Sequence, residues 1–142
     1  MRTNSLMFAQ MPRVMLPVIL ALAAVTFYRG HHVPGGGFIG GLVGALAFIL
    51  VALGQGTEAA RRAMWLEPIT LLWMGVGVAL FALVLGFVGG SGGFQGLWLD
   101  EFTVPLIGKV HLGTPMLFDL GVFLTVMGFG TKVGFGLQED NL

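Results

Sequence analysis

The chain has 142 residues, of which 56% are hydrophobic and 10% are charged, and its mean hydropathy is +0.90. Soluble globular proteins carry about 25% charged residues, so this composition excludes a soluble enzyme and a disordered chain. Seven basic residues balance seven acidic ones and there is no cysteine, which argues against a nucleic-acid binder and excludes a disulfide framework. The sequence therefore predicts an all-α integral membrane protein, with residues 1–142 as a single membrane domain.

Four apolar stretches come close to the roughly 20 helical residues that cross a bilayer core. They cover about residues 10–28, 38–54, 69–88 and 115–133. Pro68 and Pro115 mark the starts of the third and fourth stretches, because the first helical turn tolerates a missing N–H. The first stretch has the basic start of a cleaved signal peptide, but its apolar residues continue to Tyr28, so we interpret it as a span.

The basic residues predict the orientation of the four helices. Five of the seven lie at the N-terminal end, between spans two and three, or near the C-terminus: Arg2, Arg13, Arg61, Arg62 and Lys132. The other two, Arg29 and Lys109, fall in the opposite loops. Because cytoplasmic loops carry an excess of Lys and Arg, we expect an N-in, C-in topology.

An irregular Pro/Gly turn is predicted directly before the second span. Pro34 breaks a helix, and the triplet Gly35, Gly36 and Gly37 forms helix poorly. Irregular backbone at membrane depth persists only where protein or a water-filled cavity satisfies its polar groups. We therefore expect this turn to lie against other protein or to line a cavity.

Small residues recur at every fourth position of the second span. They mark two adjacent faces, one with Gly36, Gly40 and Gly44 and the other with Gly37, Gly41 and Ala45. Such faces let helix backbones approach closely. We expect this span to pack against protein on more than one side, with Gly40, Gly41 and Gly44 in helix contacts.

Asp119 is the only acidic residue inside a predicted span, four residues after Pro115. Two roles are open for its carboxylate. Ionisable groups inside membranes are costly, and they are candidates for moving ions or protons. The alternative is a structural acid that pairs with a partner subunit or with loop backbone, and that the dipole of a nearby helix N-terminus favours.

The three histidines, His31, His32 and His111, fall on the predicted outer side. Adjacent histidines in extended backbone point in opposite directions, so we expect no metal site here, and no cofactor motif is present. His31 is a candidate for a hydrogen bond to the glycine turn. Because histidine titrates near neutral pH, it is also a candidate for handling protons.

The segments Gly30–Leu42 and Gly113–Val122 closely resemble the MrpB (MnhB) subunit family of the multisubunit Mrp-type Na⁺/H⁺ antiporters. The resemblance covers about residues 10–135 and is looser at His32 and Val33. It implies a transporter subunit in the cell membrane, within a hetero-oligomer that uses proton motive force to exchange H⁺ for Na⁺. The family positions that it marks as functional candidates are Pro34, Gly35, Gly36, Gly37 and Phe38, and Asp119 matches the family acid.

Two hypotheses describe the subunit's own role. In the first, Asp119 and the glycine turn line part of the ion pathway. In the second, the subunit serves assembly and its glycine-rich faces hold neighbouring helices. The alternative identity is the equivalent subunit of a membrane-bound hydrogenase or another complex I-like complex. An independent homo-oligomeric transporter is disfavoured, because four helices with one acid lack the paired repeats of alternating-access transporters.

Overall fold

The computed structural model describes residues 6–30, 36–89, 102–104, 108–110 and 113–141. In chain order these form α1 (Leu6–Arg29), α2 (Gly36–Gln55), α3 (Thr57–Ala63), α4 (Pro68–Val88), β1 (Phe102–Val104), β2 (Gly108–Val110) and α5 (Thr114–Glu139). Four of the described helices, α1, α2, α4 and α5, are long and apolar enough to cross a membrane. The predicted class of a four-span helical membrane protein is confirmed.

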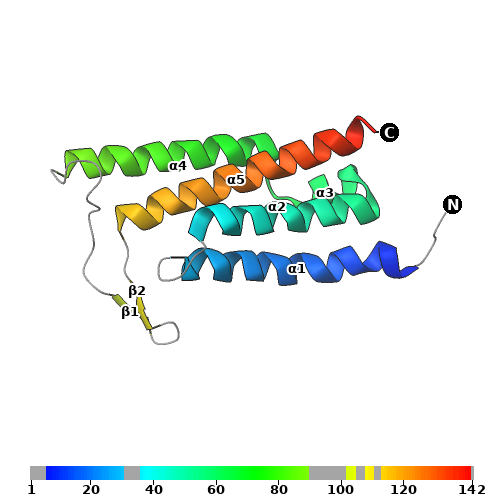
Figure 1. The fold of residues 1–142 in the computed structure, drawn as a ribbon, viewed down its shortest axis with the longest axis horizontal. Helices are drawn as coiled ribbons and strands as arrows, with labels where there is room; N and C mark the ends of the chain where they lie inside the picture. Colours follow the sequence, from blue (N-terminus) through cyan, green and yellow to red (C-terminus); the bar gives the residue numbers. More distant parts are fainter. Residues whose placement is uncertain (1–5, 31–35, 90–101, 105–107, 111–112, 142) are drawn as a thin grey trace.

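The four long helices lie side by side in the order α4, α5, α2, α1 (Figure 1). α5 packs against α4 on one side and α2 on the other, and α1 packs against α2. The short α3 lies against α2, and it also touches α5. The start of α1 and the end of α5 are at the same end of the molecule, as an even number of spans requires (Figure 1). The inward direction of that end stays a prediction.

Three short elements of the structure, α3, β1 and β2, were not among the sequence expectations. α3 has only seven residues, too few for hydrophobic periodicity to distinguish it from a loop. β1 and β2 form an antiparallel pair in the long loop before α5, with Thr103 opposite Lys109. The long helices also exceed their predicted bounds, since α1 continues from Leu6 across two prolines and α5 continues to Glu139.

α2 is one of the two inner helices of the layer and the most buried of the four spans. In its most apolar stretch 56% of the residues are buried, compared with 11% in the corresponding stretch of α1. α2 contacts α1, α3 and α5, so the expectation that this span packs on more than one side is confirmed. Its bulky core residues, Phe48 and Val51, pack with Leu71 of α4 and Phe135 of α5.

The backbones of α4 and α5 come into direct contact through glycine. A Cβ atom at Gly121 would lie 2.6 Å from the backbone nitrogen of Ala79 and 2.7 Å from the carbonyl oxygen of Gly75. A Cβ at Gly128 would lie 2.6 Å from the carbonyl oxygen of Pro68. Real Cβ atoms do not approach backbone this closely, so the spacing of the two helices requires glycine at both positions.

Hydroxyl groups inside α5 are satisfied locally. Thr131 is fully buried, and its hydroxyl donates to the carbonyl oxygen of Met127 at 2.7 Å. The hydroxyl of Thr125 donates to the carbonyl oxygen of Gly121 at 2.8 Å. A bilayer offers no water to unpaired donors, so these bonds allow α5 to place polar side chains at its helix contacts.

We predict that Gly121→Ala separates α4 from α5, whereas Gly136→Ala leaves the packing intact. Both glycines lie in α5, but a Cβ at Gly136 would have no atom within 4 Å. Overpacking of this kind costs about 1–3 kcal/mol. The measurement is the temperature at which the fluorescently tagged protein in detergent loses its monodisperse size-exclusion peak. Equal midpoints for the two variants would contradict the prediction.

Candidate functional site

Asp119 of α5 binds the backbone at the start of α2. The N–H of Gly37 donates a hydrogen bond to Asp119 Oδ1, with an N···O distance of 2.8 Å, in a partly buried position. The two residues are 82 positions apart in the sequence. We call this contact, made by Asp119 with Gly36 and Gly37, the Asp119 clasp.

The clasp requires glycine on the α2 side. Gly36 has a φ of 85°, in the left-handed region that favours glycine, and a Cβ there would lie 3.2 Å from Asp119 Oδ2. A Cβ at Gly37 would lie 2.6 Å from Asp119 Oδ1 and closer still to the carbonyl oxygen of Asp119. Both glycines are buried. The start of α2 therefore rests directly on the second turn of α5.

The negative charge of the Asp119 carboxylate suits its position at the N-terminus of α2. The first N–H groups of a helix have no partner within that helix, and the helix dipole places partial positive charge there. Asp119 supplies one acceptor for those groups, at the N-terminus of α2. From the sequence, the helix N-terminus expected near Asp119 was that of the helix that carries it. The structure shows that the partner is α2.

Apolar and small residues surround the inner side of the clasp. The ring of Phe123, one turn after Asp119, lies 5.3 Å centroid to centroid from the ring of Phe27 on α1. A Cβ at Gly40 would meet Phe123 at 3.1 Å and the carbonyl oxygen of Ala23 at 3.0 Å. α1, α2 and α5 thus meet directly beneath the carboxylate.

The other glycines expected in helix contacts are also buried in α2. A Cβ at Gly41 would lie 2.7 Å from the carbonyl oxygen of Phe123, and one at Gly44 would lie 2.7 Å from the Met127 sulfur. Gly41 faces α5, while Gly40 and Gly44 lie where α1 and α5 both approach. The two small-residue faces of α2 therefore share α5 as a partner.

Of the remaining candidates, the structure describes only Phe38. Phe38 is 58% exposed on the first turn of α2, so its ring faces the surroundings of the chain. Pro34, Gly35 and His31 lie outside the described residues, as do the other two histidines, and the metal-site expectation is therefore untested. Among the residues that the structure describes, no group of three or more His, Cys, Asp or Glu side chains is positioned to hold a metal ion.

A second polar contact lies at the opposite end of α5, and sequence reasoning missed it. Arg61 of α3 forms ion pairs with Glu67 at 2.9 Å and with Glu139 at 3.0 Å. Its guanidinium also lies 5.3 Å from the ring centroid of the fully buried Phe135. The hydrogen bond to Glu139 raises the pKa of Arg61 above its already high ordinary value, against the opposing effect of burial. Arg61 therefore joins α3, the start of α4 and the end of α5.

No local signal in the sequence identifies either contact. Arg61 and Glu139 are 78 positions apart, and only their places in the folded chain bring them together. For the contact of α5 with α4, the sequence does carry a signal in the glycines of α5. Gly121 and Gly128 are seven residues apart, which places them on one helix face.

Comparison with known proteins identifies the family. A family model described as "Domain related to MnhB subunit of Na+/H+ antiporter" matches residues 7–132. The chain belongs to the MnhB family. The match spans α1, α2, α3 and α4 and most of α5, including both sides of the Asp119 clasp.

MnhB relatives match over almost the whole chain. The B subunit of the Na(+)/H(+) antiporter of Alkalihalophilus pseudofirmus is 30% identical over 142 residues, covering 100% of this chain and 98% of the relative. The protein of the same name from Bacillus subtilis is 32% identical, covering 98% and 96%. The probable A/B subunit of a K(+)/H(+) antiporter from Rhizobium meliloti is 38% identical over 92% of this chain, which spans 13% of that longer protein.

A solved structure supports the fold. A chain in the structure of the Mrp complex from Dietzia sp. superposes with a TM-score of 0.74 at 27% identity. The superposition covers 96% of this chain and 15% of the Dietzia chain. This MnhB chain therefore corresponds to one part of that longer polypeptide.

We predict that Gly37→Ala destabilises the protein by about 1–3 kcal/mol. The new methyl group would meet the backbone carbonyl of Asp119, and a backbone group cannot relieve the contact by changing its side-chain rotamer. Gly77→Ala is the matched control, since a Cβ there has no atom within 4 Å. The measurement is thermal unfolding of the purified complex. Rescue of Gly37→Ala by Asp119→Ala would contradict this reason, because the backbone clash persists in the double variant.

We also predict that Arg61→Gln lowers the thermal midpoint more than Arg62→Gln does. Arg61 bonds two carboxylates from a side chain that is 24% exposed. Among the described residues Arg62 pairs only with Glu58, and its side chain is 79% exposed. Partly exposed pairs contribute up to about 1 kcal/mol each. The folded-state pKa of Arg61 is raised, so its contribution persists throughout the neutral range. Added salt should narrow the difference between the two variants, and a difference independent of salt would contradict an ionic origin.

Proposed function

We propose that this MnhB chain is the B subunit of a multisubunit cation/proton antiporter in the cell membrane, and that its own role is to hold helices in register within that complex. The family match, the antiporter relatives and the superposition on the Mrp complex support the first part. The single observation that supports the structural role is the Asp119 clasp, in which the Asp119 carboxylate accepts a hydrogen bond from the backbone of the same chain.

The structural role follows because the clasp joins α5 to the start of α2. α2 is the most buried of the candidate spans, and its first turn depends on Asp119 for an acceptor. A hydrogen bond to a charged group is worth about 1.5–3 kcal/mol, and inside a membrane the donor has no water to replace it. Loss of the acceptor would therefore release the start of α2 and, with it, any neighbouring subunit that packs on Phe38.

The ion pathway is the second candidate function, and one observation favours it. Among the described residues, no hydrogen bond reaches the second carboxylate oxygen of Asp119, Oδ2. Asp119 is also the only acid away from the helix ends in the four described spans. In this role, Oδ2 would bind the proton or the cation together with further ligands from other subunits.

The proposal for the transported cation rests on the relatives alone. The names of the two full-length relatives specify Na⁺, and that of the Rhizobium meliloti protein specifies K⁺. We propose Na⁺ as the cation and proton motive force as the driving force. The chain serves as part of a transporter, and we assign it no enzymatic reaction.

Asp119→Asn and Asp119→Ala together separate the two roles. Asn keeps an oxygen acceptor for the Gly37 N–H but loses the charge, whereas Ala loses both. We expect Asp119→Asn to assemble and to retain most Na⁺/H⁺ antiport, and Asp119→Ala to lose assembly. The measurements are cation-dependent proton movement in everted vesicles, with Na⁺ and with K⁺, and native gel electrophoresis of the complex.

Asp140→Asn is the matched control, because it removes an exposed acid beyond the end of α5. Full assembly of Asp119→Asn with antiport abolished would overturn the structural role and place Asp119 on the ion pathway. Full assembly and full antiport of Asp119→Ala would remove the residue from both roles.

A further inference from the structure

We propose that the chain binds an anionic phospholipid in a two-part site on one side of the helix layer. The first part is a pocket of about 490 Å³ among α1, α2 and α3, which carries Arg13, Arg62, Gln55 and Glu58. The second is a groove of about 480 Å³ whose lining residues are all hydrophobic. We refer to them as the basic pocket and the apolar groove.

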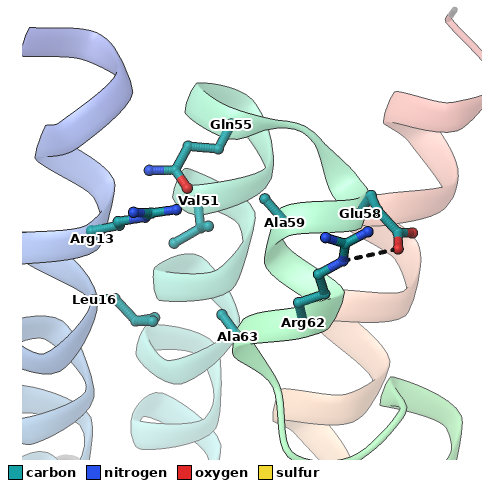
Figure 2. Close-up of a pocket in the computed structure, with 8 residues that line it drawn as sticks. All are labelled: Arg13, Leu16, Val51, Gln55, Glu58, Ala59, Arg62 and Ala63. Atoms are coloured by element: carbon teal, nitrogen blue, oxygen red, sulfur yellow. Dashed lines mark hydrogen bonds and ion pairs between the residues drawn. The ribbon is translucent and has the colours of Figure 1, made fainter. Parts of the chain in front are cut away.

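The basic pocket has the composition of a phosphate site. Figure 2 shows Arg13 extending from α1 toward α2, with Arg62 on α3 beyond Val51. Two arginines face one acid, so the pocket carries a net positive charge. Guanidinium groups match the geometry of phosphate oxygens, and basic pockets between membrane helices bind anionic headgroups.

Arg13 is the stronger of the two cations for a ligand. Arg62 is paired with Glu58 at 3.3 Å, but both side chains are more than 70% exposed, so this pair is weak. Arg13 forms no ion pair with any carboxylate in the described part of the chain. A charge in the first half of a membrane helix, with no counter-ion among the described residues, is a suitable partner for a lipid phosphate.

The apolar groove adjoins the basic pocket. Leu16 and Ala63 line both spaces, so the two spaces meet at these residues. From this junction the groove passes along α1 to Leu20, with Phe48 and Phe123 among its lining residues. Arg13 and Leu20 are seven residues apart, or about 10 Å along α1. A charged pocket beside an apolar groove matches the arrangement of a phospholipid, in which an acyl chain follows a charged headgroup.

Trp65 marks the depth of the junction. Its side chain is 99% exposed in the segment between α3 and α4, and it lines the mouth of the groove. Tryptophan concentrates at the level of lipid headgroups, where its ring is apolar and its N–H is polar. The basic pocket therefore lies at headgroup level and the apolar groove lies within the hydrocarbon region.

The test uses the purified antiporter complex in vesicles that contain a photoactivatable phosphatidylglycerol or its phosphatidylcholine counterpart. We expect phosphatidylglycerol to label the peptides of α1 and α3 around Leu16 and Ala63. Labelling should fall about fivefold in Arg13→Gln and further in the Arg13→Gln/Arg62→Gln variant. Glu58→Gln should raise it, because that change removes the acid and releases Arg62. Inorganic phosphate should not displace the lipid, since phosphate cannot fill the apolar groove.

Arg29→Gln/Lys132→Gln is the matched control, because it removes two positive charges that lie outside both spaces. Equal labelling by the two lipids, or labelling unchanged in the Arg13 and Arg62 variants, would overturn the proposal. The competing occupant is a helix of a neighbouring subunit. The chain has no cysteine, so Leu20→Cys provides a single reporter, and its cross-linking to another subunit in the assembled complex would also overturn the proposal.

Discussion

The structure depends on the contact of the α5 backbone with a helix on each side. Gly36, Gly37 and Gly41 of α2 lie against one side of α5, and Gly75 of α4 lies against the other. In a bilayer, burial of apolar surface does not drive helices together, because lipid is as apolar as the side chains. Close packing and hydrogen bonding must do so instead, and both need backbones that approach without Cβ atoms between them. The order α4, α5, α2 follows from this constraint.

Polar contacts mark the two ends of this packed region. The Asp119 clasp lies near the start of α5, and the ion pair of Arg61 with Glu139 lies at its end. Asp119 and Glu139 are 20 residues apart, which is about 30 Å of helix and close to the thickness of a hydrocarbon core. These two contacts fix the register of α5, against α2 near its start and against α3 at its end.

The sequence predicted the class of fold well because each span is a long, local, apolar signal. It also predicted that α2 is close-packed, because the spacing of Gly40 and Gly44 reflects one helix face. It did not predict that Asp119 binds Gly37, although both residues were candidates, since a contact across 82 positions depends on how helices pair. α3 and the β1–β2 pair escaped prediction because elements of seven and three residues are too short for periodicity. The sequence did not predict the contacts of Arg61 either, because Arg61 and Glu139 are also far apart in the sequence.

α2 and α5 are in contact but far apart in the sequence, and this has a consequence for biosynthesis. α2 enters the membrane well before Asp119 is synthesised, so its first turn and its glycine faces lack their α5 partner during that interval. Only α1, of the helices that pack on α2 within the membrane, is already present. The nascent chain therefore passes through a stage in which α2 is incompletely covered. Insertion factors or early-assembling subunits have a defined surface to protect at that stage, and membrane proteases have one to recognise when synthesis stops before α5.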